Sequence, residues 1–210
     1  MKLLYCAIFI LVLATMARHI LLFILCSFIL SCKPDTYTPK PRGFYQVDFP
    51  KREYRQFNLP GYPYTFEYPV YANIIKDTVY FDKKPENPWW INIDFPSIGG
   101  RIYLSYKAIS PQQPLSKLLE DAHKLTYYHD KRADYIEPQV FNSKYGVTGL
   151  MYSVGGNAAS AYQFIASDSV KNFVRGALYF DVTPNADSLK PMNDFLRRDM
   201  EHMMETFKWQ

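Results

Sequence analysis

Cysteine is almost absent from this sequence of 210 residues, and the position of the three cysteines matters more than their number. Cys6 and Cys26 lie inside an apolar leader, and Cys32 ends it. A mature chain that begins at Cys32 would therefore contain no second thiol. Disulfides, cysteine-ligated metals and thiol catalysis are excluded from the folded part of such a chain.

Acidic residues are also missing before Cys32. The leader contains two apolar stretches, and neither reaches the ~20 residues that a membrane-spanning helix needs. The two stretches are residues 3–14 and 20–30. The second follows a short basic segment that begins at Met16, which is the layout of a secretory signal peptide. We expect translation to begin at Met16, and a single long leader from the first methionine is the alternative. In both cases residues 1–31 form the leader.

The leader ends in "ILSC" at residues 29–32, which resembles the bacterial lipobox. An aliphatic residue stands three before the cysteine, and a small residue stands directly before it. The resemblance implies cleavage before Cys32 and attachment of a diacylglyceryl group to its thiol. Acyl chains such as palmitate then anchor the protein, because each buried methylene contributes ~0.8 kcal/mol and two or three chains hold stably. The alternative is a cysteine that happens to end a transmembrane anchor.

A proline-rich stretch, residues 32–43, follows the cysteine. Its prolines favour the extended polyproline II conformation, so we predict a tether that holds the domain ~30 Å from the lipid headgroups. Lipoproteins exported to the surface of Bacteroidota carry an acidic cluster here, whereas this chain has only Asp35. We therefore expect an outer-membrane anchor with the domain facing the periplasm. Tyr37, Lys40 and Arg42 form a candidate interaction surface on the tether.

Charge of one sign is not in excess after the leader. The chain carries 24 basic and 20 acidic side chains, and two of the basic ones, Lys2 and Arg18, precede Cys32. Nucleic-acid binding normally needs a concentrated basic face, so we expect no nucleic-acid partner. Residues 44–210 are long enough for one domain.

Alternation with a period of two predicts strands through most of this domain. Ile91, Ile93 and Phe95 point to one side, and 96–100 reads as the turn of a hairpin. Gly155-Gly156 marks a second hairpin turn. The predicted strands occupy residues 64–69, 70–75, 89–96, 101–107, 145–154, 159–167 and 173–182.

Two segments have the period of a helix instead. One begins at Pro114 and the other carries an apolar stripe from Leu189 to Phe207, with Asp187 or Ser188 as its expected cap. This order predicts an α+β fold, with one mostly antiparallel sheet and two main helices packed on it. The segment "PYTFEYPVYANI" resembles the strand–turn opening of PsbP/Mog1-like sandwiches, which share the order.

Only one pattern has the spacing of metal ligands: Glu120 with His123 on the first helix, and Asp199 with His202 on the second. Such pairs hold di-metal centres in four-helix bundles, but two of the helices are missing here. Both pairs are expected beside the apolar stripes. No Ser-His-Asp set or G-x-S-x-G elbow occurs. We expect no enzyme activity, no cofactor and no metal, with a metal-dependent hydrolase built on these pairs as a distant alternative.

Aromatic residues exceed what a core requires, because the chain has 18 tyrosines and the adjacent pair Trp89-Trp90. Neighbouring strand residues point to opposite faces, so one of these tryptophans is expected to point away from the core. Helices that cover both sheet faces would instead bury both rings. An exposed aromatic face can stack on sugars or dock another protein, so Trp89 and Trp90 are candidate interaction residues.

Several long motifs together resemble the gliding-motility lipoprotein GldD family of Bacteroidota, over about Cys32 to Trp209. The resemblance implies a cell-envelope lipoprotein required for gliding, whose surface adhesins leave through the type IX secretion system. Cys32 matches the lipidated cysteine of the family, and no catalytic residue is implied. The motifs are "YTPKPRGFYQVDFP", "YTFEYPVYA", "WWINIDFP", "IYLSYK", "GNAASAYQF", "FVRGALYFDVTPNADSL" and "PMNDFLRRDMEHMMETFKW".

We expect the protein to act without catalysis, by assembling or stabilising the motility and secretion machinery through contacts with other envelope motility lipoproteins or type IX components. The membrane is a partner through the anchor at Cys32. The alternative is a periplasmic module that binds glycan or peptidoglycan through Trp89 or Trp90.

Overall fold

The computed structural model describes residues 13–22, 24, 46–78 and 85–210. The contacts within the chain divide it into two units, Met1–Gly43 and Phe44–Gln210. The described residues of the first unit, 13–22 and 24, are helical. In the parts of the chain that the structure describes, no helix combines the length and hydropathy that a membrane span requires.

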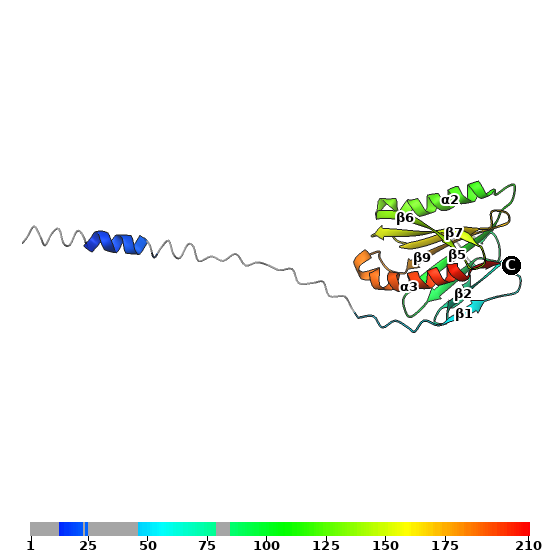
Figure 1. Cartoon of the computed structure of the whole chain (residues 1–210), viewed down its shortest axis with the longest axis horizontal. Helices are drawn as coiled ribbons and strands as arrows, with labels where there is room; N and C mark the ends of the chain where they lie inside the picture. Colours follow the sequence, from blue (N-terminus) through cyan, green and yellow to red (C-terminus); the bar gives the residue numbers. More distant parts are fainter. Residues whose placement is uncertain (1–12, 23, 25–45, 79–84) are drawn as a thin grey trace, which may run out of the picture. The chain divides into compact units, whose positions relative to one another are not determined.

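Phe44–Gln210 contains two sheets (Figure 1). The larger has the strand order β3-β4-β5-β9-β8-β7-β6, and each neighbouring pair is antiparallel. The smaller has the order β1-β2-β10. The strands are β1 (Tyr54–Phe57), β2 (Tyr64–Pro69), β3 (Asn73–Lys76), β4 (Ile91–Phe95), β5 (Gly100–Ala108), β6 (Ala133–Asn142), β7 (Thr148–Gly156), β8 (Tyr162–Ser167), β9 (Asn172–Phe180) and β10 (Lys208–Trp209).

The predicted hairpins are present. β4 and β5 pair antiparallel around the turn that contains Gly99, whose φ of 72° lies in the region that glycine adopts without strain. β7 and β8 pair antiparallel after Gly156, which has a φ of 83°. Both turns therefore form where the sequence places glycine between two alternating apolar segments.

The first face of the large sheet is covered by helix α3 (Ala186–Thr206) and by the small sheet (Figure 1). Alternate residues of the central strands meet aromatic residues of β2 and apolar residues of α3 in one large core. The members that define this face are Ile91, Ile93, Phe95, Ile102, Leu104, Phe164, Val174 and Leu178. The expected sharing of one face by Ile91, Ile93 and Phe95 is confirmed.

Among the residues that the structure describes, helix α2 (Leu115–Tyr127) covers part of the second face of the large sheet. Leu118 and Ala122 of the helix pack on the strand residues Tyr152, Ile165 and Phe173. Ile165 lies between Phe164 and Ala166, which belong to the core of the first face, so α2 and α3 lie on opposite faces of the sheet. The short 3-10 helix η1 (Tyr128–Lys131) follows α2.

The predicted α+β class is confirmed, with the refinement that the strands divide between two sheets. Helix α2 begins at Leu115, one residue after the expected start at Pro114, which occupies the N-cap position without a capping side-chain hydrogen bond. The expected cap of α3 was wrong. Asn185, and not Asp187 or Ser188, is the N-cap, because its side chain accepts a hydrogen bond from the backbone N–H of Ser188.

Candidate functional site

The two adjacent tryptophans do not form an open aromatic surface. The side chain of Trp90 is 5% exposed, and its indole N–H donates to the carbonyl oxygen of Tyr106 at 2.7 Å. Trp89 is half-buried, donates to the carbonyl oxygen of Gly61 at 2.7 Å and packs edge-on against the Tyr106 ring. The expectation that Trp90 is available for interaction is wrong, because its position at the start of β4 places the ring in the core.

The other candidate interaction residues, Tyr37, Lys40 and Arg42, lie outside the described residues, as does Cys32. Of the candidate interaction residues that the structure describes, only Trp89 is partly exposed. A sugar platform built on these two tryptophans has no support from the geometry.

The two carboxylate–histidine pairs lie on helices that cover opposite faces of the sheet. Glu120 forms an exposed ion pair with Lys124 at 2.5 Å, and His123 stacks on Tyr127. Asp199 and His202 lie on α3, on the other side of the large sheet. Among the residues that the structure describes, no group of three or more potential metal ligands is present. A hydrolase that needs both pairs in one site is therefore rejected.

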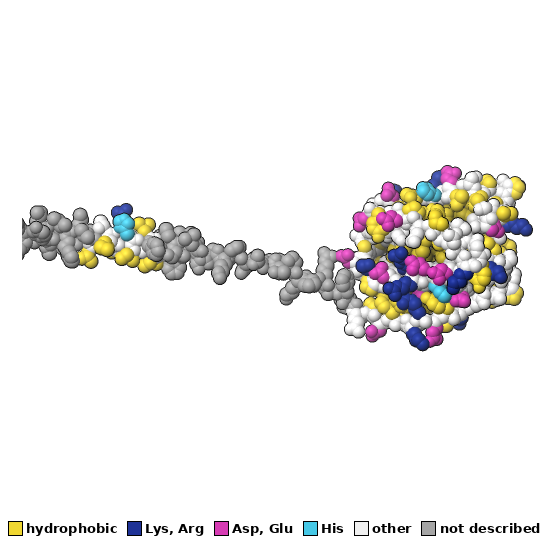
Figure 2. Space-filling view, viewed as in Figure 1, with side chains coloured by type: hydrophobic (Ala, Val, Ile, Leu, Met, Phe, Trp, Pro, Cys, Tyr) yellow, Lys and Arg dark blue, Asp and Glu magenta, His cyan; other side chains and the backbone are white. Residues whose placement is uncertain are grey.

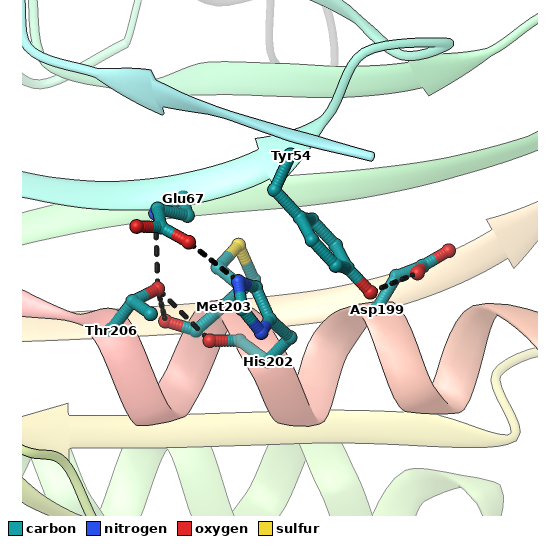
Figure 3. Close-up of polar contacts among 6 residues, drawn as sticks. All are labelled: Tyr54, Glu67, Asp199, His202, Met203 and Thr206. Atoms are coloured by element: carbon teal, nitrogen blue, oxygen red, sulfur yellow. Dashed lines mark hydrogen bonds and ion pairs between the residues drawn. The ribbon is translucent and has the colours of Figure 1, made fainter. Parts of the chain in front are cut away.

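Asp199 is the centre of a buried polar cluster between α3 and the small sheet (Figure 3). Its side chain is 1% exposed and accepts hydrogen bonds from the hydroxyls of Tyr54, at 2.9 Å, and of Tyr71. The guanidinium of Arg52 lies 3.3 Å from the same carboxylate. Burial, and then the hydrogen bond to the Asp199 carboxylate, raise the pKa of the Tyr54 and Tyr71 hydroxyls. Both tyrosines therefore remain neutral donors at physiological pH.

His202 extends this cluster by one helical turn (Figure 3). Its Nε2 lies 2.7 Å from the carboxylate of Glu67 on β2, and its ring stacks on Tyr54 at 3.7 Å. The hydroxyl of Thr206 accepts from the backbone N–H of Glu67 and donates to the carbonyl oxygen of His202. The potential acid and base groups of α3 are thus engaged in holding the helix on β1 and β2.

Phe49 and Arg52, which precede β1, also pack against α3 beside this cluster. Phe49 stacks on Phe195 of α3 at 4.3 Å, and the guanidinium of Arg52 lies 4.1 Å above the same ring while donating to the Phe195 carbonyl oxygen. The sequence contained a signal for this role. Asp199 has the i, i+3, i+4 spacing of the apolar stripe, three residues after Leu196 and four before Met203, and it was wrongly expected beside the stripe.

Two cavities lie on the second face of the large sheet, which also carries α2. One, of about 430 Å³, is lined by polar and aromatic side chains of β4, β5 and β9 together with the β4–β5 turn. The other, of about 290 Å³, lies between α2 and the strands β5 and β9. The first contains Asp94, Arg101, Tyr103, Tyr179 and Asp181 in its wall, and the second contains Ser105, Lys107, Leu118, Asp121 and Arg175.

Polar atoms near the second cavity lack protein partners. Gln163 is 1% exposed, and its Oε1 accepts from Thr126 at 3.2 Å and from the guanidinium of Arg175. Within the described chain, Gln163 Nε2 and Arg175 Nε are buried without a hydrogen-bond partner, and no carboxylate pairs with Arg175. Buried polar groups in native proteins are usually satisfied. Of these two residues, Arg175 lines the second cavity, whereas Gln163 does not.

Apolar side chains are exposed around α2 and along β6, the edge strand beyond β7. Figure 2 shows hydrophobic side chains gathered where α2 lies, whereas acidic and basic side chains are mixed over α3. A groove of about 220 Å³ between α2 and the strands is lined mainly by apolar residues. The exposed apolar residues that line this groove are Leu119 and Val140, which together with the groove we call the α2–β6 patch.

Comparison with known proteins gives a family and similar solved structures. The sequence model of the family described as "Gliding motility lipoprotein GldD" matches residues 34–209. No curated protein matches the chain. Among solved structures, cyanobacterial PsbP (CyanoP) from Synechocystis sp. PCC 6803 is similar, with 10% sequence identity, a TM-score of 0.46, and coverage of 79% of this chain and 98% of that chain.

Proposed function

Because the chain belongs to the gliding motility lipoprotein GldD family, we propose that it is a non-catalytic envelope protein that assembles or stabilises the motility machinery. The family match over residues 34–209 carries this proposal, since it covers nearly all of the sequence after Cys32. The family name makes the chain a lipoprotein connected with gliding motility. The non-catalytic role and the partners are the part that we add.

The anchor is Cys32 in this proposal, with residues 1–31 as the cleaved leader, 32–43 as the tether and 44–210 as the single domain. Acyl chains such as palmitate on Cys32 hold the protein at the outer membrane, with the domain in the periplasm. The lipobox-like "ILSC" at 29–32 supports this arrangement. Two or three chains are needed for stable anchoring, because one acyl chain gives only marginal membrane binding.

The absence of catalysis is supported by the state of the acid and base groups on α3. Asp199 is saturated by two tyrosine hydroxyls and Arg52, and His202 is held between Glu67 and the Tyr54 ring. A general acid or base must reach the proton of a substrate, and these side chains already bind their own chain.

Protein contact is supported by the α2–β6 patch. Val140 on β6 is 63% exposed and lines the groove with Leu119 of α2, and within the described chain β6 pairs with β7 on one side only. Edge strands present unpaired backbone groups, and exposed apolar side chains beside such an edge are typical of interaction surfaces. We propose that this patch contacts another envelope motility lipoprotein or a component of the type IX secretion system.

Site-specific photo-crosslinking in cells tests this proposal. We expect a photoreactive residue at Val140 or Leu119 to yield a crosslinked protein that mass spectrometry identifies as an envelope lipoprotein or a type IX component. The matched control is Val182, which is 60% exposed but lies just after β9 and outside the patch. If positions 140 and 119 give no more crosslinking than position 182, the assembly role loses its support.

Removal of the lipid attachment residue tests the anchor separately. We expect Cys32→Ala to move the protein from the membrane fraction to the soluble or secretory-precursor fraction, and to stop incorporation of labelled palmitate. Membrane association that persists together with normal cleavage would show that the anchor is elsewhere.

A further inference from the structure

We propose that the open part of the second face, over β4, β5 and β9, binds an oligosaccharide of low net charge. This site is separate from the α2–β6 patch and does not depend on the proposed assembly role. Its wall is formed by alternate residues of β5 and β9, which point away from the core of the first face.

The two cavities follow each other along the β5–β9 ladder. Arg101 pairs with Tyr179 and lines the first cavity, whereas Ser105 pairs with Arg175 and lines the second. Because a strand rises about 3.4 Å per residue, the stretch from Arg101 to Lys107 is roughly 20 Å long. The combined site therefore suits an extended chain of several units better than a single small molecule.

Two tyrosines supply an aromatic surface in the first cavity. Tyr103 is 37% exposed, and its ring packs edge-to-face with Tyr179 at 5.8 Å between ring centroids. His129 of η1 supports Tyr179 from the α2 side, with the rings 6.3 Å apart. The π-face of an aromatic ring is electronegative and attracts C–H groups that carry partial positive charge. The apolar side of a sugar ring presents such C–H groups, so Tyr103 is the stacking residue of the proposed site.

Donors and acceptors for sugar hydroxyls lie beside these rings. Asp94 Oδ1 is 2.8 Å from both Nε and Nη2 of Arg101, and the described residues place no donor on Asp94 Oδ2. The carboxylate of Asp181 lies in the same wall. A sugar hydroxyl both donates and accepts, so it can bond a carboxylate and a guanidinium at the same time. Arg101 offsets one of the two carboxylates, which favours a ligand without strong charge.

An extended peptide fits this face less well. Strand addition needs an edge with unpaired backbone groups, but β5 lies between β4 and β9, and β9 lies between β5 and β8. The floor of the site therefore offers side chains only. Arg175, Ser105 and Lys107 line the second cavity and continue the polar floor into it. Hydrogen bonds from a polyhydroxylated ligand suit that floor.

Saturation-transfer difference NMR on the lipidated full-length protein tests the proposal. The probes are the β-linked tetramer of N-acetylglucosamine and the α-linked tetramer of glucose, with the protein held in a zwitterionic detergent that carries no sugar. We expect ring-proton saturation for at least one tetramer and a dissociation constant that rises at least tenfold in Tyr103→Ala. Tyr103→Phe keeps the stacking ring and is expected to bind within threefold of the wild type.

Tyr145→Ala is the matched control, because Tyr145 is 58% exposed but lies in the β6–β7 turn outside both cavities. It should bind as the wild type does. Thermal unfolding of each variant shows whether the fold is kept, and Tyr103→Phe provides the comparison if Tyr103→Ala is destabilised. The proposal is overturned if neither tetramer is saturated at millimolar concentration, or if folded Tyr103→Ala binds as tightly as Tyr145→Ala.

Discussion

The two faces of the seven-stranded sheet bury their side chains in different ways. On the first face, α3 and the small sheet enclose a large aromatic core, and Phe66, Phe207 and Leu196 are almost completely buried. On the second face, two residues of α2 and three strand residues form a smaller cluster of five buried residues, and two cavities lie on the same face. The difference indicates that the first face contributes most of the free energy of unfolding. The second face keeps cavities that a ligand can occupy.

Buried polar groups differ between the two faces in how their acceptors are bonded. The Asp199 carboxylate on the first face is bound by Tyr54 at the start of β1, by Tyr71 after β2 and by Arg52 before β1. On the second face, Gln163 and Arg175 bond each other but leave buried nitrogens without a protein acceptor. Arg52 Nε on the first face also lacks a hydrogen-bond partner in the described chain, so the contrast lies in the buried carboxylate, which only the first face has at its centre.

Two identical substitutions measure this contrast directly. Leu196 of α3 is 0% exposed and Leu118 of α2 is 2% exposed. We expect Leu196→Ala to lower the free energy of unfolding by about 4 kcal/mol and Leu118→Ala by about 2 kcal/mol, because the small cluster beside open cavities can relax more easily. Urea unfolding followed by tryptophan fluorescence measures both. Equal losses would show that the two faces are equally packed.

The polar cluster on the first face gives the next largest effect. Asp199→Asn keeps the shape of the side chain but removes the charge that binds Arg52 and the two tyrosines. We expect a loss of about 3 kcal/mol in the free energy of unfolding, since a partly buried cation is left without its partner.

Asp194→Asn is the matched control for Asp199→Asn on the same helix. Asp194 pairs with Lys190 at an exposed position, and such a pair contributes at most about 1 kcal/mol. If Asp199→Asn is no more destabilising than Asp194→Asn, the cluster does not hold α3 on the small sheet.

On the second face, the corresponding test is Thr126→Val, which removes the hydroxyl that donates to Gln163 Oε1. Because Arg175 still donates to that oxygen, we expect a loss of only about 1 kcal/mol. Thr148→Val removes an exposed hydrogen bond to Asn142 and should change stability by less than about 0.5 kcal/mol. A loss of several kcal/mol for Thr126→Val would mean that the second face depends on its polar contacts as strongly as the first.

Local sequence pattern was sufficient for the elements that alternate or repeat cleanly. Ile91, Ile93 and Phe95 share a face because successive strand residues point to opposite sides, and that rule needs no knowledge of the partner strand. β6 was missed because it lies at the sheet edge, contains Pro138 and leaves most of its residues exposed. Its strand conformation depends on pairing with β7, which a local pattern does not reveal.

Local sequence pattern was also insufficient to locate the candidate sites. Alternation along β5 places Arg101, Tyr103, Ser105 and Lys107 opposite Ile102 and Leu104, but the cavities that they line depend on how the rest of the chain packs. Trp90 is buried by neighbours distant in the sequence, and its indole N–H donates to the carbonyl oxygen of Tyr106 on β5. Long-range packing therefore decides which side of an alternating strand is open.

The smallest expected effect concerns His129, which lies at the border of the open face. Burial, and then the positive charge of Arg175, lower the pKa of the His129 imidazole from its ordinary value of about 6.5. As the pH falls below about 6.5, the unfolded chain takes up a proton at this residue before the folded chain does, so stability decreases. We expect His129→Gln to reduce this slope in urea midpoints measured between pH 5 and 8. An unchanged slope in His129→Gln would show that burial and the charge of Arg175 do not lower the pKa of His129.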